Sequence, residues 1–300
     1  MTTFIAPGSS EWLKLITPSK VPSILGVSRF KSQYTLWHEM AGLVEPSPIS
    51  EGQQDDFDYG HAAEMAAAEY WKYKNPGWLI SRGEVQLSNE ALPFPNLVTV
   101  DRRGVRGSHR RVVEVKTARD LEEWGDEGSG ETPADYAAQV SAQMVFTGWT
   151  KQAGNIVLWP QYGKPKIYVV EFKPAVAEWI VNECVAWMES LRTLTPPPLD
   201  DSVTCYETVK ALHPDIDGTD APIDPELAAE FLRADREEKD AKQRARGYKT
   251  KLLDAMGNAR VAKVGDVKIA NRRPNSHKGV SLYANGKADP ESLTKGTEAA

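Results

Sequence analysis

The stretch from residue 78 to residue 172 contains five segments with the composition of β-strands, and this pattern constrains the fold most strongly. One of them, residues 110–117, reads RRVVEVKT and is rich in β-branched residues, which favour extended strands. The other four cover residues 78–88, 97–103, 154–159 and 166–172. A helical pattern from Ala134 to Gly148, with Pro133 just before it, separates the first three segments from the last two. We therefore predict an α/β domain with a mixed central β-sheet and a hairpin across Gly104–Gly107.

Helical patterns precede and follow these strands. Residues 57–73 contain the run HAAEMAAAEYW, whose alanines have high helix propensity, and residues 174–193 are amphipathic. Apolar residues at helical spacing between residues 11 and 43 predict two short helices around a structured loop. The polar residues 44–56 and the acidic, glycine-rich residues 119–132 are interpreted as a surface connection and a mobile loop. The helices are expected to flank the sheet.

The C-terminal third differs in composition and is expected to form a separate part. The run TPPPLDD is typical of a linker. Beyond it the pattern predicts a long charged helix capped near Gly257 and a β-hairpin that turns at Gly265-Asp266. The expected parts are a core, a linker, a C-terminal helix plus β-hairpin extension and a polar tail, at residues 1–194, 195–222, 223–283 and 284–300. The pattern leaves the task of the extension open between oligomerisation, DNA contact and docking of another protein.

Composition excludes several classes of protein. The chain has 300 residues, of which 41% are hydrophobic and 26% charged, as in ordinary globular domains. It has no apolar run long enough to span a bilayer and no signal-peptide pattern, so no membrane association and a cytoplasmic location are expected. Two cysteines provide neither a disulfide framework nor a four-cysteine metal site. A net charge of -6 argues against a protein that coats nucleic acid indiscriminately.

The segment 97–117 carries the residues best suited to chemistry. Asp101 ends one predicted strand, and Glu114 and Lys116 stand two apart in the next, so their side chains project from the same face. Carboxylate oxygens suit Mg²⁺ or Mn²⁺, and an ammonium group can position a water molecule and stabilise negative charge on a phosphate. An E-x-K pattern alone fits a surface ion network equally well.

The order of the surrounding motifs adds to this pattern. Along residues 11–192 they are a loop Ser19–Ser28 with Ser32 and Leu36-Trp37, Gly60-x3-Glu64, Asp101, Glu114-x-Lys116 and Tyr136-x-x-Gln139. In this order they resemble the phage λ exonuclease and YqaJ-type viral recombinase family of the PD-(D/E)xK nuclease superfamily. Thr99-Val100-Asp101-Arg102 stands where that family usually has S-P-D-G.

The resemblance implies a PD-(D/E)xK nuclease core that hydrolyses phosphodiesters with Mg²⁺, or alternatively Mn²⁺, as the cofactor. The implied metal ligands are the carboxylates of Glu64, Asp101 and Glu114 and the backbone carbonyl of Val115. Lys116 would lie beside the attacking water, and Gln139 would orient Lys116 or the scissile phosphate. Apart from the resemblance, the pattern at position 64 fits an exposed helix glutamate.

Double-stranded DNA ends are the expected partner. Seven basic residues and one acid, Glu114, lie between residues 102 and 119, a local excess that fits phosphate neutralisation and also a solvated basic hairpin. Hydroxyl and basic groups in the early loop can hold a terminal phosphate. The expected DNA-binding residues are Ser28, Arg29, Ser32, Arg102, Arg103, Arg106, Tyr136 and Gln143. Gln143, one helical turn after Gln139, fits a half-buried polar residue equally well.

The resemblance also implies a reaction and partners. The enzyme would resect linear duplex DNA from 5′ to 3′, as a ring of subunits, and leave a 3′ strand for a single-strand annealing protein in phage recombination within the host cytoplasm. Two alternatives stay open. One is an endonuclease or RecB-like nuclease, and the other is a catalytically silent DNA-binding recombination module.

Overall fold

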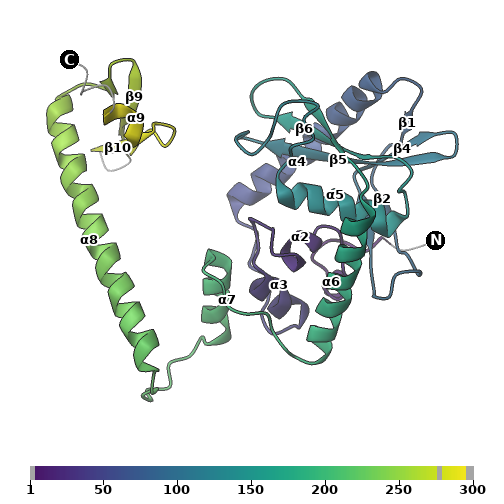
Figure 1. Ribbon diagram of the computed structural model, residues 1–300, viewed down its shortest axis with the longest axis horizontal. Helices are drawn as coiled ribbons and strands as arrows, with labels where there is room; N and C mark the ends of the chain where they lie inside the picture. The colour runs from purple at the N-terminus through teal and green to yellow at the C-terminus, as the bar shows by residue number, and fades with distance from the viewer. Residues whose placement is uncertain (1–3, 276–278, 295–300) are drawn as a thin grey trace. The chain divides into compact units, whose positions relative to one another are not determined.

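The computed structural model describes residues 4–275 and 279–294 and divides into two compact units, residues 1–216 and 217–300 (Figure 1). The helices of the first unit are α1 (Ser10–Leu13), α2 (Val21–Ile24), α3 (Gln33–Met40), α4 (Glu51–Lys74), α5 (Ala134–Thr147), α6 (Pro174–Arg192) and α7 (Val203–Leu212). Its strands are β1 (Leu79–Ile80), β2 (Val85–Leu87), β3 (Val98–Val100), β4 (Arg102–Arg106), β5 (His109–Ala118), β6 (Gly154–Pro160) and β7 (Lys166–Val170).

A five-stranded mixed sheet with the order β1-β4-β5-β6-β7 forms the centre of the first unit. Strands β5 and β6 are parallel and are joined by a crossover that contains α5, whereas the other neighbouring strands pair antiparallel. Strands β2 and β3 form a separate antiparallel pair. This architecture confirms the predicted α/β class with a mixed central sheet.

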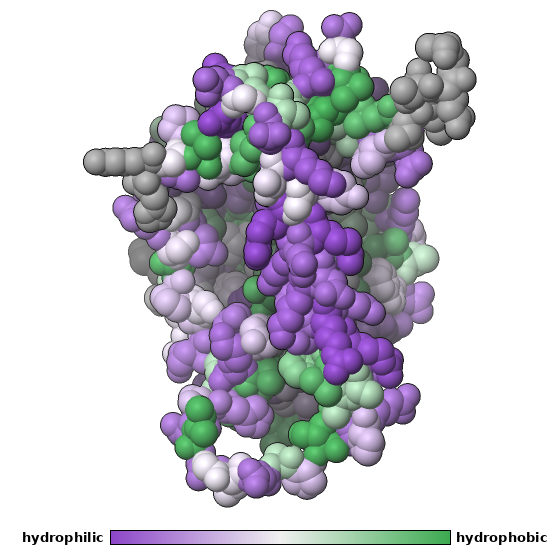
Figure 2. All heavy atoms as spheres, turned by 90° about the vertical axis from the view of Figure 1, so that its left-hand side faces the viewer, coloured by the Kyte–Doolittle hydropathy of each residue, from purple (hydrophilic) through white to green (hydrophobic). Residues whose placement is uncertain are grey.

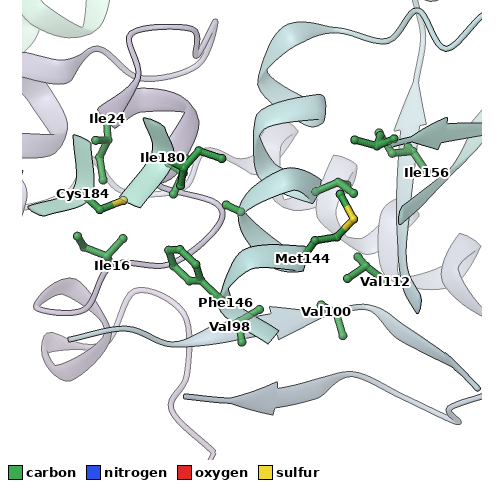
Figure 3. Packing of buried hydrophobic residues seen from close by; sticks show 14 of the residues in the cluster. Ile16, Ile24, Val98, Val100, Val112, Met144, Phe146, Ile156, Ile180 and Cys184 are labelled. Carbon is green, nitrogen blue, oxygen red and sulfur yellow. The ribbon is translucent and has the colours of Figure 1, made fainter. Parts of the chain in front are cut away.

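The two faces of the sheet are covered by different helices (Figure 1). Ala67 and Trp71 of α4 pack against alternate residues of β5, Val113 and Val115. On the other face, Val140 and Met144 of α5 join the larger core, which also contains Val112, Ile156 and Ile180. Figure 3 shows Met144 beside Val112. Because strand side chains alternate between faces, this packing fixes Glu114 and Lys116 on the α5 face.

Two element boundaries differ from the sequence prediction. Helix α4 begins at Glu51, inside the segment interpreted as a surface connection, because Ser50 and Gln53 form a capping box that satisfies the first backbone amides. The hairpin between β4 and β5 turns at Gly107-Ser108, where Gly107 has a φ of 57°. Both differences reflect local hydrogen bonding that apolar periodicity does not report.

Part of the predicted linker is a helix that packs on the first unit. Ser202 caps α7 by accepting a hydrogen bond from the Cys205 amide (3.1 Å). The hydroxyl oxygens of Thr208 on α7 and Thr35 on α3 lie 2.8 Å apart and are buried. The division between the two units therefore falls after Ile216, later than the predicted end of the core.

The second unit contains the long charged helix predicted from the sequence and a small sheet. Its elements are α8 (Pro225–Met256), β8 (Val261–Val264), β9 (Val267–Pro274), β10 (Val280–Ala284) and α9 (Pro290–Thr294). Strands β8 and β9 turn at Gly265-Asp266, as predicted, and β10 adds a third antiparallel strand to the expected hairpin. Helix α9 lies in the segment predicted as a polar tail, the end of which falls outside the described residues.

None of the helices in the described part of the chain has the length and apolar character needed to cross a membrane.

Gly104 of β4 allows α4 to approach the sheet closely. A Cβ atom at this position would lie 2.8 Å from the ring of Trp71, a fully buried side chain whose Nε1 donates to Asn155 (2.9 Å). We expect Gly104→Ala to lower the free energy of unfolding by roughly 1–3 kcal/mol because the indole ring must shift. Urea unfolding measures the loss. Gly52→Ala, at an exposed helical position with free space around it, is the matched control, and equal stability of the two variants would contradict the expectation.

Candidate active site

Asp101 lies at the break between β3 and β4 and faces the middle of β5. Its Oδ2 accepts a hydrogen bond from the backbone amide of Val115 (2.7 Å). Burial raises the pKa of Asp101 well above its ordinary value, and the nearby charge of Glu114 raises this pKa further, while Lys116 and the Val115 hydrogen bond oppose the shift. Metal-free Asp101 is therefore a carboxyl group whose ionisation is costly until a cation compensates it.

Glu114 is the most highly connected carboxylate of the site. Its Oε1 accepts hydrogen bonds from Lys116 Nζ (2.7 Å) and Gln139 Nε2 (2.6 Å), and its Oε2 accepts one from Gln143 Nε2 (2.7 Å). Glu114 is buried with 2% exposure. Lys116, two residues after Glu114 on β5, and the two glutamines one turn apart on α5 thus all donate to one carboxylate. This network fixes the orientation of Glu114.

Lys116 presents a protonated amine beside this carboxylate. Burial alone would lower the pKa of Lys116, but the charges of Glu114 and Asp101 outweigh it and raise the pKa above its ordinary value. The ammonium nitrogen also lies 5.0 Å from the centre of the Tyr136 ring, a cation–π geometry. Lys116 therefore acts here through positive charge and hydrogen-bond donation.

Glu64 projects from α4 and forms an ion pair with Arg102. Arg102 Nη1 donates to Glu64 Oε2 (3.1 Å) and to the carbonyl oxygen of Asp101 (2.6 Å). The Arg102 side chain is buried, so it faces the carboxylates and is withdrawn from solvent. An arginine at the position of the family's usual glycine thus supplies a positive charge inside the site.

Glu84 is a further carboxylate of the site, and the sequence analysis did not identify it. Glu64, Glu84 and Asp101 each offer one oxygen, and these oxygens lie within 4.8 Å of one another. Glu84 lies in the turn between β1 and β2. Burial raises its pKa, and the charge of Glu64 adds to this rise while His61 and Arg102 oppose it. Ser81-Arg82-Gly83-Glu84 has the composition of an ordinary turn, and no spacing in it marks a ligand.

The donor set fits a hard divalent cation. Carboxylate oxygens of Glu64, Glu84 and Asp101 converge. Burial is the main cause of the raised pKa values of Asp101 and Glu84, and the charges of Glu64 and Glu114 raise both further, so a bound cation would favour their ionised forms. Glu114 lies close enough to Asp101 to affect its pKa. The Val115 amide is held against Asp101, whereas the ligand role of the Val115 carbonyl stays a prediction.

Two hollows border Tyr136, next to Lys116. One, of about 250 Å³, is lined by Lys20, Ser28, Lys31 and Gln139 among others. Burial lowers the pKa of Lys20 to about 7, with Lys31 contributing and Glu39 opposing. The other hollow, of about 280 Å³, is lined by Arg29 and Arg119 among others. Ser28 and Arg29 of the early loop thus lie beside the carboxylate site.

Arg29 is already engaged by acidic side chains. Its guanidinium donates to both carboxylate oxygens of Asp135 (2.9 and 3.0 Å) and contacts Glu123. It also lies 4.9 Å from the ring of Tyr136. Burial lowers the pKa of Arg29, but hydrogen bonding to Asp135 and the negative charge of Asp135 outweigh this effect. The net result is a raised pKa. A DNA phosphate would have to share or replace these partners.

The other expected DNA-binding residues have diverse surroundings. Ser32 caps α3 by accepting from Thr35. Gln143 is fully buried against Glu114, so it supports the site from within. Arg103 is half-buried, and exposed Arg106 stacks at 4.8 Å on Trp78. Of the predicted arginines in β4, Arg106 is therefore the one most open to a phosphate.

Gln143 is expected to hold Glu114 in its active orientation. Gln143→Leu removes the donor to Glu114 Oε2 and to the Thr99 carbonyl (3.1 Å). Because Oε2 of the buried Glu114 carboxylate then lacks a donor, we expect the free energy of unfolding to fall by about 1–3 kcal/mol and cleavage to slow. Denaturant unfolding and single-turnover cleavage measure the two effects. Ser141→Ala, on the same helix but lining a different hollow, serves as the control, and wild-type cleavage by the leucine variant would refute this role.

The fold and the site agree with the expectation from the sequence. A mixed sheet in which one strand follows an aspartate and the next carries E-x-K, flanked by a helix that supplies glutamines to the same carboxylate, is the arrangement that the resemblance to the PD-(D/E)xK nuclease superfamily predicts. Residues 11–150 match the sequence model of the YqaJ-like viral recombinase domain. This match agrees with the resemblance found in the sequence.

The solved structures to which the chain is similar include two exonucleases. An alkaline exonuclease from Laribacter hongkongensis is 19% identical, with 68% of this chain and 98% of that chain covered and a TM-score of 0.49. A phage-related exonuclease from Haemophilus somnus is 13% identical, with coverage of 60% and 94% and a TM-score of 0.44. No curated protein matches the chain.

Proposed function

We propose that the protein is a divalent-metal-dependent nuclease that degrades linear double-stranded DNA from its ends. Lys116 and Gln139 converge on the Glu114 carboxylate, and Glu114 lies beside the three carboxylates Glu64, Glu84 and Asp101; this arrangement carries the proposal. Buried carboxylates that repel one another cost stability. Such an arrangement is typical of a site that binds a cation and performs chemistry.

The chain's own residues account for much of the proposed chemistry. Glu64, Asp101, Glu114 and Glu84 would hold Mg²⁺ or Mn²⁺. When bound, the metal would polarise the phosphate and lower the pKa of a water molecule. Lys116 would place its ammonium group beside the attacked phosphate, where positive charge stabilises the developing negative charge. Gln139 would hold the Glu114 carboxylate in place by donating to its Oε1, the oxygen that also accepts from Lys116 Nζ.

The hollows around Tyr136 suit a DNA end. Ser28 Oγ accepts hydrogen bonds from the amides of Phe30 and Lys31 (both 3.2 Å), and its own proton remains available for a phosphate oxygen. Arg29 and Arg119 lie on the other side of Tyr136, where a phosphate could replace their present partners Asp135 and Asp56. We propose that this region holds a terminal 5′-phosphate and that digestion runs from 5′ to 3′. The product would be a 3′ single strand for an annealing protein in phage recombination, and subunits assembled as a ring would give processivity.

Digestion of a linear duplex beside its closed circular form tests this function. With Mg²⁺ we expect loss of the linear DNA only, faster with 5′-phosphate than with 5′-hydroxyl ends, and no reaction in EDTA. Cutting of the circle would identify an endonuclease instead. Tight DNA binding without cleavage of either form would identify a silent DNA-binding module, in which Arg102 permanently neutralises Glu64.

A further inference from the structure

Helix α8 carries large apolar side chains that the second unit leaves exposed. Leu227, Phe231 and Tyr248 are 61%, 68% and 71% exposed. Only the C-terminal end of α8 packs into a described apolar cluster, through Leu252 and Met256 against the small sheet. In Figure 2, hydrophilic residues cover much of the helix, and hydrophobic residues gather at its lower end, where α8 begins. This helix therefore presents a long surface for a partner.

Eight positions of α8, seven of them apolar or small, follow a heptad pattern, and exposed Leu232 lies outside it. Steps of four and three residues alternate through Leu227, Phe231, Ala234, Glu238, Ala241, Ala245, Tyr248 and Leu252. Such spacing places them along one stripe of a helix that winds around another helix. The helix has 32 residues, a length of about 48 Å at 1.5 Å per residue. We call these eight residues the α8 stripe.

Charges on both sides of the α8 stripe separate by sign along the helix. The flanking positions carry Glu230, Asp235 and Glu237 in the first half and Lys242, Arg244, Lys249 and Lys251 in the second half. The helix dipole favours acids and bases at opposite ends, but its effect fades within the first and last turns. Asp235, Glu237, Lys242 and Arg244 lie near the middle of α8, so the dipole does not explain their order.

We infer that α8 pairs with α8 of a second copy of this chain in an antiparallel coiled coil. With the two-fold axis between residues 239 and 240, the α8 stripe matches itself: Phe231 lies level with Tyr248 and Ala234 with Ala245 of the second copy. Leu227 lies level with Leu252, which is half-buried and also packs on the small sheet of its own unit. In an antiparallel pair each flank of the stripe meets the same flank of the partner. Glu230 then faces Lys251, Asp235 faces Lys242, and Glu237 faces Arg244 of the second copy.

The charges that flank the α8 stripe disfavour a parallel, in-register pair of α8 helices. There, opposite flanks meet, so Glu230 would face Asp235 and Arg244 would face Lys249 of the second copy. Two of the three flanking contacts would be repulsive, and the attraction of Glu237 to Lys242 would remain. The inference does not depend on nuclease activity, since every residue that carries it lies in the second unit.

Glu238 is the one charged residue within the α8 stripe. It lies near the two-fold axis, opposite Ala241 of the second copy. Within its own helix, Glu238 Oε1 forms an ion pair with Lys242 Nζ (2.7 Å). A polar residue at such a position costs stability while it fixes register. Glu238→Leu should tighten self-association by about tenfold or more, and weaker association of this variant in sedimentation equilibrium would count against the pairing.

Site-specific cross-linking of the full chain tests the orientation. Ala234→Cys mixed with Ala245→Cys should yield a disulfide-linked dimer under mild oxidation, and Ala234→Cys alone should not. Arg236→Cys mixed with Gln243→Cys is the matched control, because these two positions are level with each other in the antiparallel pair but lie on the outer face of α8. The native Cys184 and Cys205 are buried. Failure of the first mixture to cross-link, or efficient cross-linking of Ala234→Cys with itself, would overturn the antiparallel pair.

Charge reversal provides an independent test. A variant with Glu230, Asp235 and Glu237 changed to lysine, and one with Lys242, Arg244 and Lys251 changed to glutamate, should each lose α8 pairing. Mixed together they should form a heterodimer, detected by native mass spectrometry, because their flanks are again complementary. Circular dichroism checks that α8 stays helical. Homodimers of either variant as stable as wild type, or no heterodimer, would show that another surface or partner covers the α8 stripe.

Discussion

Replacement of Lys116 by alanine is expected to reduce the rate of DNA cleavage by about 10²- to 10⁴-fold. The ammonium group is the positive charge that donates directly to Glu114, and the neighbouring carboxylates keep it protonated. Without it, the site loses the group that stabilises charge at the reacting phosphate. Single-turnover cleavage of a linear duplex at saturating Mg²⁺ measures the effect on chemistry apart from DNA binding.

Two controls separate this role from a general loss of charge. Lys166→Ala, on strand β7 of the same sheet, removes a lysine without altering the site and should cleave at the wild-type rate. DNA affinity of the Lys116 variant, measured in EDTA, should change far less than its cleavage rate. Cleavage by Lys116→Ala within a few-fold of wild type would remove Lys116 from the mechanism.

Asp101→Asn is expected to stabilise the metal-free protein and to abolish cleavage. In the folded state Asp101 retains its proton to higher pH than in the unfolded chain, since burial and Glu114 raise its pKa. Its contribution therefore favours folding at low pH and is lost as the pH rises through the raised pKa. At neutral pH the metal-free asparagine variant should therefore be more stable than the wild type.

Unfolding of both proteins over a pH series, with EDTA or Mg²⁺, measures this effect. In EDTA the advantage of the variant should grow as pH rises and vanish in acid. Mg²⁺ should raise the melting temperature of the wild type much more than that of Asp101→Asn, because binding to the native state alone adds stability. If Mg²⁺ stabilised both proteins equally, the metal would bind elsewhere in the chain.

The residues that converge in space through regular structure were predictable from the sequence. Glu114 and Lys116 share a face because strand side chains alternate, and Gln139 and Gln143 share one because they are a helical turn apart. Strand and helix periods therefore bring all four together at β5 and α5. The E-x-K spacing predicts the face but not the partners, which depend on the crossover between β5 and β6.

The remaining features depend on tertiary contacts or local hydrogen bonds. Glu84 joins the site from a turn whose position is set by the pairing of β1 with β4. Arg102 was expected to face DNA, yet the pairing of β4 with β5 directs it towards α4 and Glu64. Helix α7 follows a proline-rich run that suggested a linker, and its threonine contacts with α3 hold it on the first unit.

The dependence of cleavage on Mg²⁺, compared between wild type and Glu114→Gln, tests the central claim most directly. The glutamine keeps the size of the side chain but loses the charge that contacts Lys116. We predict that wild-type nucleotide release from a linear duplex is absent in EDTA and saturates with added Mg²⁺, and that Glu114→Gln releases none at any Mg²⁺ concentration. Equal release in EDTA, or by the folded glutamine variant, would show that this cluster is not the site of a metal-dependent nuclease.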